Sequence, residues 1–424
     1  MKKPELLLPA GNMEKLEYAI KYGADAVYLG VPDFSLRAMR KGSIITSENL
    51  KEAVSLAHSL NAKAYLTINI FAYNNDIRNL PAFCEIVKNA NPDSIILSDI
   101  GVFNVIRKRL PNIPIHISTQ ANSLNFETVK FWRDNGAKRV ILARELPLTD
   151  VAEIKKEVSD IELESFVHGS QCVSYSGRCL LSDYMTNNER KANQGNCAQP
   201  CRWSYKLVEE TRPNQYFEIE QTERGTHILS TKDLCLVKHI KELTEAGIDS
   251  FKVEGRTKSL YYVSAVAKAY RNAIDTYFED NNADLSNYYE ELLKVGNRGY
   301  TQGFYFGDNN SESYSYDVSK GLAGADFLCE FLGEEKDGYF KVKIKNKIIP
   351  DSTLEIITPK EQFSTKVLEI RTEDFELKPV GNTNDEVFIK FENSPIDYKY
   401  AIARTEGIMF INKKEASKTC PCAD

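Results

Sequence analysis

The chain has 424 residues, of which 42% are hydrophobic and 27% are charged. This composition is typical of a globular protein with a substantial core and excludes a mainly disordered chain. The length predicts two or three domains. The formal net charge of −6 gives no overall attraction to nucleic acid, so an RNA partner would have to bind a local basic surface.

The N-terminal segment MKKPELLLPAG does not resemble a signal peptide, because Pro9 and Gly11 interrupt its short apolar run. No segment approaches the roughly 20 apolar residues that span a bilayer. We therefore expect a cytoplasmic protein that does not associate with a membrane. Thiols stay reduced in the cytoplasm, where clustered cysteines are more typical of metal sites than of disulfides.

Short apolar runs alternate with amphipathic helical patterns, such as Glu14–Lys21, between residues 5 and 280. Most runs are continuous and rich in Val, Ile and Leu, which is typical of parallel strands buried on both faces. A weak repeat, in which a glycine and a polar pair precede a strand, occurs at Gly23, Gly136 and Gly247. These units predict a (β/α)8 TIM-like barrel. A doubly wound open sheet is the alternative, but no glycine-rich phosphate-binding motif follows the first strand. The expected strands are Glu5–Leu8, Ala26–Leu29, Lys63–Ile70, Ser94–Ser98, Ile113–Ser118, Arg139–Ala143, Ile161–His168 and Ser250–Glu254.

A cysteine-rich insertion, about residues 170–248, separates the last two expected strands. Its four cysteines have six, seventeen and three residues between them. An iron–sulfur cluster needs one thiolate for each iron, whereas paired zinc-binding cysteines usually have two residues between them. Zinc and four unrelated buried thiols remain alternatives. Because the insertion starts where a barrel strand ends, we expect it to cover the barrel mouth, which is the active-site face of such barrels. The four cysteines are Cys172, Cys179, Cys197 and Cys201.

The insertion is also expected to contain a hairpin, formed by Tyr205–Glu209 and Tyr216–Gln221, and a helix over Leu234–Ala246. After the barrel, residues 281–325 are expected to be a linker and connecting segment. Six period-two segments within residues 326–412 then predict a small antiparallel β-barrel. A tail, residues 413–424, ends the chain.

Two features of the C-terminal part are open to more than one interpretation. Alternate lysines predict a lysine row on one strand face, which suits either a phosphate backbone or a protected sheet edge. The Cys420-Pro421-Cys422 tail is either a redox or metal-handling pair or a segment without function. The lysines of the row are Lys341, Lys343, Lys345 and Lys347.

Polar residues follow the expected strands and should converge on the barrel mouth, where they can bind a substrate and transfer protons. Structural roles compete with the catalytic ones: any arginine can form an ion pair, His168 can support the cysteine-rich loop, and Glu164 can pair with a basic residue inside the barrel. No HExxH or GxSxG motif indicates a protease. The catalytic candidates are Arg144, Glu145, His168, Arg178, Glu254 and Arg256, with Asn69, Ser98, Asp99, Ser118–Asn122 and the Lys252–Arg256 run nearby.

Several segments in order along the chain resemble the collagenase-like peptidases of family U32, whose catalytic type is unknown. They are PELLLPAG, KYGADAVYLG, IHISTQAN, RVILARELPL, ESFVHGSQC, YSGRCLLS, NQGNCAQPCRWSY, KVEGRTKSLYYV and NRGYTQGFYFG. Within the family the chain is most similar to the prephenate-dependent tRNA uridine 5-hydroxylases, which act on the wobble uridine without molecular oxygen.

This resemblance implies a [4Fe-4S] cluster on the four clustered cysteines and prephenate, a small dicarboxylate, as co-substrate. Arg144, Arg178 and Arg256 are the candidates for its carboxylates. The anticodon loop of tRNA would be the RNA partner, and an unpaired base would stack on an aromatic side chain. Tyr175 and Trp203 suit that role, with core packing as the alternative for Trp203. Ribosomal RNA hydroxylation, peptidase activity and a related paralogous subunit remain open.

Overall fold

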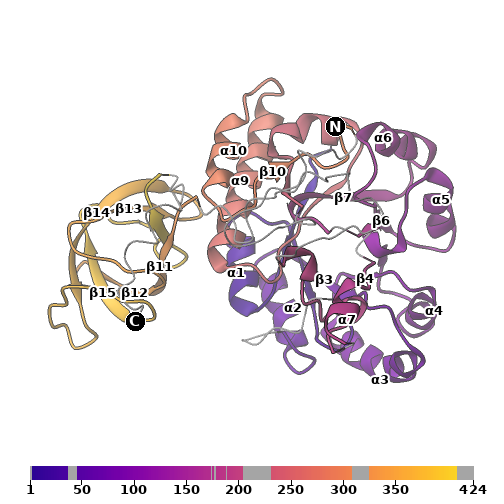
Figure 1. Cartoon of the computed structure of the whole chain (residues 1–424), viewed down its shortest axis with the longest axis horizontal. Coiled ribbons are helices and arrows are strands. Elements are labelled where there is room, and N and C mark those ends of the chain that lie inside the picture. The colour runs from indigo at the N-terminus through magenta and orange to yellow at the C-terminus, as the bar shows by residue number, and fades with distance from the viewer. Residues whose placement is uncertain are drawn as a thin grey trace, which may run out of the picture. The chain divides into compact units, whose positions relative to one another are not determined.

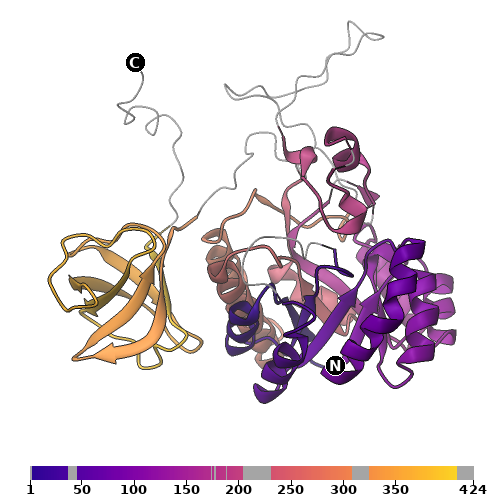
Figure 2. The ribbon, with the colours of Figure 1, turned by 90° about the horizontal axis from the view of Figure 1, so that it is seen from below.

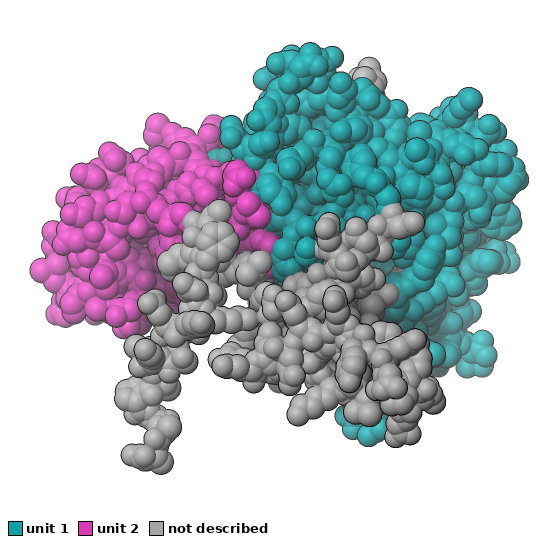
Figure 3. All heavy atoms as spheres, turned by 45° about the horizontal axis from the view of Figure 1, so that its top comes forward, with its two compact units in different colours: residues 1–289, 298–319 teal, residues 290–297, 320–424 magenta. Residues whose placement is uncertain are grey.

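The computed structural model describes residues 2–36, 45–172, 174, 175, 178–187, 189–203, 231–307 and 324–407. The chain divides into two compact units, which Figure 3 shows in different colours. Unit 1 comprises residues 1–289 and 298–319, and unit 2 comprises residues 290–297 and 320–424. The predicted hairpin at residues 205–221 and the Cys420-Pro421-Cys422 tail lie outside the described residues.

Unit 1 is a closed parallel barrel, as the sequence predicts. Seven strands follow one another in order, and β9 closes the barrel because Phe251 pairs with Leu6 of β1 and Ser165 of β7. Figure 1 shows the helices arranged around these strands. All eight expected strands are confirmed. They are β1 (Glu5–Pro9), β2 (Ala26–Gly30), β3 (Lys63–Ile68), β4 (Ser94–Leu97), β5 (Ile115–Ile117), β6 (Arg139–Ile141), β7 (Glu162–Ser170) and β9 (Ser250–Val253).

Four helices of unit 1 begin at polar side-chain caps. Asn12, Asp99, Asn125 and Ser259 each accept a hydrogen bond from a backbone N–H in the first turn of their helix, which satisfies one of its unpaired donors. No helix in the described part of the chain is long and apolar enough to cross a membrane. The helices are α1 (Met13–Lys21), α2 (Leu50–Ser59), α3 (Asn74–Ala90), α4 (Ile100–Arg109), α5 (Phe126–Asp134), α6 (Leu148–Glu157), α7 (Leu181–Met185), α8 (Ile240–Glu245), α9 (Leu260–Glu279) and α10 (Ser286–Leu293).

The predicted helix over Leu234–Ala246 is wrong at its start. Residues Asp233–Cys235 form a short strand, β8, which runs antiparallel to the end of β7. A 3-10 turn at Val237–His239 precedes α8, which starts only at Ile240. Pairing with β7 satisfies the backbone groups of β8, so this tertiary contact outweighs the local helical pattern. A further short strand, β10 (Tyr300–Thr301), pairs with β8 in parallel.

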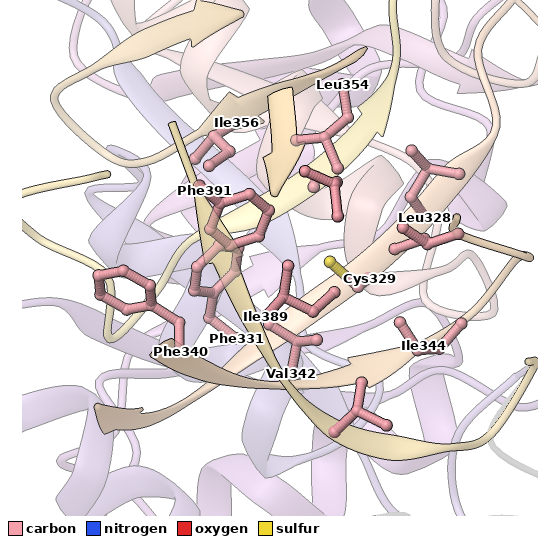
Figure 4. Packing of buried hydrophobic residues seen from close by; sticks show 14 of the residues in the cluster. Leu328, Cys329, Phe331, Phe340, Val342, Ile344, Leu354, Ile356, Ile389 and Phe391 are labelled. Atoms are coloured by element: carbon pink, nitrogen blue, oxygen red, sulfur yellow. The ribbon is translucent and has the colours of Figure 1, made fainter. Parts of the chain in front are cut away.

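Unit 2 contains the predicted small antiparallel barrel. The strands close in the order β11, β12, β15, β14, β13, β16. Figure 4 shows part of its core, in which Phe331, Phe340 and Phe391 lie close together among aliphatic side chains. The strands are β11 (Phe327–Lys336), β12 (Tyr339–Ile344), β13 (Thr353–Ile357), β14 (Gln362–Arg371), β15 (Glu386–Phe391) and β16 (Ile402–Thr405).

The lysine row does not protect a sheet edge. Strand β12 pairs with β11 on one side and with β15 on the other, so the edge interpretation is wrong. Lys341 pairs with Glu373 at 3.0 Å, Lys343 with Glu386 at 3.1 Å, and Lys345 with Glu330 at 2.7 Å. These carboxylates already neutralise the three lysines, which weakens the case for a phosphate-binding row.

Candidate functional site

A cavity of about 220 Å³ lies at the barrel mouth, lined by strand ends and by the cysteine-rich segment. In Figure 2 the magenta part of the ribbon, which includes α7, extends beyond one end of the barrel. The expected convergence at this face is therefore found. Of the predicted catalytic candidates, Arg144, Glu145, Glu254 and Arg256 line the cavity, together with Asn69 and Gln120.

All four clustered cysteines line the same cavity and none forms a disulfide. The backbone N–H of Leu181 donates to Cys179 Sγ at 3.3 Å, and that of Gln199 donates to Cys197 Sγ at 3.3 Å. Such donors stabilise negative charge on sulfur. Burial raises the pKa of the Cys201 thiol, the Arg202 guanidinium opposes this effect, and the charges of the other three thiols add to the rise. The four thiols are thus close enough to interact electrostatically, and a bound cation would relieve that repulsion.

The geometry of the thiols bears on which metal group they fit. Within the described ranges, no three His, Cys, Asp or Glu side chains are placed so that they could hold one metal ion. The cysteines instead surround a cavity, and a four-iron cluster, with one cysteine for each iron, is larger than a single ion. Four soft sulfur donors around a cavity fit an iron–sulfur cluster by their chemistry, and the same donor set also suits a structural zinc.

Two arginines are held at the cavity wall by backbone and hydroxyl groups. Arg144 Nη1 donates to the carbonyl oxygen of Ser170 at 2.8 Å, and its guanidinium lies 3.8 Å from the centroid of the Phe166 ring. Arg256 Nη1 donates to Thr67 Oγ1 at 3.0 Å, and its Nη2 donates to the carbonyl oxygen of Leu36. Both side chains are therefore held in place before any ligand binds, which lowers the entropic cost of binding an anion.

The other two catalytic candidates lie outside the cavity lining. Arg178 is exposed and donates to the carbonyl oxygen of Gln120 at 2.8 Å. His168 is 1% exposed and lies among the rings of Tyr262, Tyr270 and Tyr300. Burial lowers the pKa of His168 to about 3. A neutral imidazole among aromatic rings matches the structural role that the sequence left open.

The barrel floor below the cavity contains buried ion pairs. Lys252 Nζ donates to Glu164 Oε1 at 2.7 Å, and Arg139 Nη1 donates to Glu164 Oε2 at 2.9 Å. Arg139 also pairs with Glu5 at 2.6 Å. Glu164 is thus paired inside the barrel, as the structural alternative predicts. Lys252 lines the mouth cavity, so this network reaches the site.

Exposed aromatic side chains lie in the same segment as the cysteines. Tyr175 is 56% exposed and also lines the cavity, and Trp203 is 40% exposed. Core packing is therefore the wrong interpretation for Trp203. Arg202 precedes Trp203, and Arg178 and Arg190 are exposed in the same segment. Aromatic surface beside cationic groups is the combination that unpaired nucleotides require.

Sequence reasoning placed Lys252 at the barrel mouth, in the Lys252–Arg256 run, but did not count it among the catalytic candidates, and it did not identify two further residues at the cavity floor. Lys252 carries a charge within an otherwise apolar strand, SFKV, which is a signal that a sequence reader could use. Tyr28 and Phe166 also line the cavity. Nothing in the sequence separates these two rings from ordinary core residues of buried strands.

Comparison with known proteins agrees with the division of the chain. Residues 11–315 match the model of peptidase family U32, and residues 324–404 match that of the peptidase family U32 C-terminal domain. A solved structure of a U32 peptidase covers 59% of this chain and 93% of its own, with a TM-score of 0.39 and 11% sequence identity.

Curated relatives carry two different kinds of name. The tRNA hydroxylation protein P of Escherichia coli is 37% identical, over 90% of this chain and 92% of its own. The tRNA hydroxylation protein P1 of Bacillus subtilis is 40% identical over 79% of each chain. A protein of Porphyromonas gingivalis named collagenase is 33% identical, over 72% of this chain and 75% of its own. On the family models and these relatives, the chain belongs to peptidase family U32.

Proposed function

We propose that this protein is a tRNA-modifying enzyme that hydroxylates uridine at carbon 5, most specifically at the wobble position. The observation that carries the proposal is that four free cysteines, fixed arginines and exposed aromatic rings meet at one barrel mouth. Relatives that match most of this chain are named for tRNA hydroxylation, which supports the same activity here.

Cys172, Cys179, Cys197 and Cys201 would hold a [4Fe-4S] cluster. Such a cluster supplies one-electron transfer when it is bound, or shapes the site without exchanging electrons. The N–H groups of Leu181 and Gln199 donate to two of the sulfurs, and donors of this kind tune the reduction potential of a cluster. The cavity next to the cysteines gives the small substrate a place beside this site.

Prephenate is the proposed co-substrate, and the oxygen donor is not molecular oxygen. A dicarboxylate needs cations held in position, and Arg144 and Arg256 at the cavity wall meet this requirement. Glu145 and Glu254 line the same cavity and are the candidates for moving a proton to or from the substrate. Arg178, exposed beside Gln120, suits a phosphate of the incoming RNA more than it suits the small molecule.

The anticodon loop supplies an unpaired base that stacks on Tyr175 or Trp203 at the mouth. Duplex RNA hides its base edges in a deep groove, so an unpaired base is the accessible substrate. We place the reaction in the cytoplasm, where tRNA is available. Peptidase activity would not explain the four cysteines at the barrel mouth. Because one relative is named collagenase, peptidase activity is the alternative that the experiment below also measures.

The test is mass spectrometry of tRNA nucleosides from a strain that lacks this gene, grown with and without oxygen. The strain is complemented with wild type, with Cys172→Ser, or with Cys84→Ala, which changes a buried thiol of α3 outside the cavity. We expect 5-hydroxyuridine derivatives under both conditions with wild type and Cys84→Ala, and none with Cys172→Ser. Unchanged modification in the deletion strain would contradict the proposal, and ribosomal RNA nucleosides and collagen cleavage would then be measured.

A further inference from the structure

Two aromatic rings at the floor of the mouth cavity each lie close to two cationic side chains. The Tyr28 ring centroid is 4.7 Å from Lys252 Nζ and 5.7 Å from the Arg256 guanidinium carbon. The Phe166 centroid is 5.4 Å from Lys252 Nζ and 3.8 Å from the Arg144 guanidinium carbon. Lys252 therefore lies between the two arginines, and these five residues, which we call the cation arc, all line one cavity.

Lys252 retains binding capacity toward the cavity. Its side chain is almost fully buried, and within the described part of the chain the ammonium donates one hydrogen bond, to Glu164. A lysine ammonium has three N–H donors, so two of them remain for a ligand. A buried cation with unused donors at a cavity wall costs free energy that an anionic ligand would recover.

The two ends of the cation arc are held on different strands. Arg256 is bound to Thr67 of β3, and Arg144 is bound to Ser170 at the end of β7. The three cations are thus spread along the cavity wall and do not converge on one point. A spread of this kind suits a ligand with two anionic groups and an apolar body that lies against the rings, more than it suits a single small anion.

We propose that Lys252 is the central binding residue for the dicarboxylate co-substrate, positioned by Glu164 and assisted by Arg144 and Arg256. This inference rests on the proposed function, because it assigns the subsite of that same cavity. Each carboxylate of the ligand accepts charge-assisted hydrogen bonds from Lys252 and from one arginine of the cation arc. Glu164 accepts a hydrogen bond from the ammonium and so orients it, while Arg139 pairs with both Glu164 and Glu5 below it.

The test is calorimetric titration of the full-length protein with prephenate and with phenylpyruvate, which keeps the pyruvyl carboxylate but has an aromatic ring without the second carboxylate. Lys252→Met should weaken prephenate binding by roughly tenfold or more, since a hydrogen bond between charged groups is lost. Lys252→Arg should retain most of the affinity. The matched control is Lys155→Met, which removes a lysine that also forms an ion pair with an acid, Asp249, at 2.8 Å, but lies outside the cavity lining.

Prephenate affinity in Lys252→Met within twofold of wild type would overturn the inference, as would equal wild-type affinity for phenylpyruvate. Thermal melting without ligand establishes that each variant folds. Lys252→Met leaves Glu164 with one cation fewer. If this single variant fails to fold, the double variant Lys252→Met/Glu164→Gln is titrated in its place. A wild-type protein that binds no prephenate but still produces 5-hydroxyuridine in tRNA would overturn the subsite and leave the proposed modification standing.

Discussion

Arg298 forms a buried ion pair with Asp233. Asp233 lies on β8, the short strand that pairs with the end of β7. Both side chains are almost fully buried. Burial raises the pKa of the Asp233 carboxyl, but Arg298 outweighs this effect and holds the pKa below its ordinary value. The pair thus ties Arg298, just before β10, to β8 within unit 1.

Breaking this pair should destabilise unit 1. In Arg298→Met the Asp233 carboxylate stays buried without its cation, and the free energy of unfolding in urea should fall by about 3–5 kcal/mol. The control is Arg133→Met, because Arg133 pairs with exposed carboxylates of Asp134 and Asp160 and exposed pairs contribute little. Equal unfolding midpoints for the two variants would contradict a stabilising role for the buried pair.

The barrel of unit 2 should lose stability in acid through Glu291. Burial raises the pKa of this carboxyl, but Arg404, Lys294 and Gln362 outweigh it and lower the pKa from 4.5 to about 2. A group whose folded pKa is lowered contributes stability above its unfolded pKa and loses it as the pH falls through the folded value. The loss due to Glu291 should therefore occur between about pH 4.5 and pH 2.

Amide hydrogen exchange of peptides from β13 and β16 checks this, after correction for the intrinsic pH dependence of exchange. Protection in wild type should decrease between pH 5 and pH 3. In Glu291→Gln, protection at pH 5 should already be lower and should change less with pH. An identical pH profile in the variant would show that Glu291 is not responsible.

The barrel strands and the gathering of the four cysteines at the barrel mouth could be predicted from the sequence, because each depends on a local signal. Apolar runs define the strands, and the close spacing of the four thiols predicts that they lie together. The start of α8 and the pairing of Arg139 with Glu5 could not be predicted, since both depend on residues far apart in the chain. The contacts of Lys252 with Tyr28 and Phe166 could not be predicted for the same reason, because the two rings come from two other strands.

Gly169 in β7 should not tolerate a side chain. Its φ is +106°, and a Cβ atom there would lie 2.5 Å from the carbonyl oxygen of Glu254 and 2.9 Å from Tyr262 Oη. Gly169→Ala should therefore displace the end of β9 and lower both stability and activity. Gly338→Ala is the control, because Gly338 has a φ of +78° but nothing within 4 Å of its added Cβ. It should cost only the backbone strain of about 1–2 kcal/mol.

Thermal melting and hydroxylation assays of these two glycine variants distinguish the effect of the close contact at Gly169 from the effect of backbone strain alone. Gly169→Ala should melt at a lower temperature than Gly338→Ala and should lose most of its activity. If both variants lose the same stability and both stay active, the close approach of Glu254 is not important for the site.

The exposed rings beside the cysteines should contribute to RNA binding. Stacking of one base is worth about 1–3 kcal/mol, so Tyr175→Ala or Trp203→Ala should weaken binding of an anticodon stem-loop by roughly fivefold to a hundredfold. Phe131→Ala changes a comparably exposed ring on α5, outside the cavity lining, and should leave binding unchanged. Fluorescence anisotropy of a labelled stem-loop measures all three, and equal affinities would rule out stacking on these rings.

The pairing of β8 with β7 fixes where the cysteine-rich segment leaves and rejoins the barrel. The end of β7 pairs with β8, residue by residue, through His168 with Cys235, Gly169 with Leu234 and Ser170 with Asp233. The two ends of the cysteine-rich segment therefore lie side by side. A loop anchored in this way can change in length and sequence without altering the spacing of the strands. The barrel strands can therefore stay the same while this segment differs between family members. Replacing the segment alone with that of another family member is then expected to change the substrate.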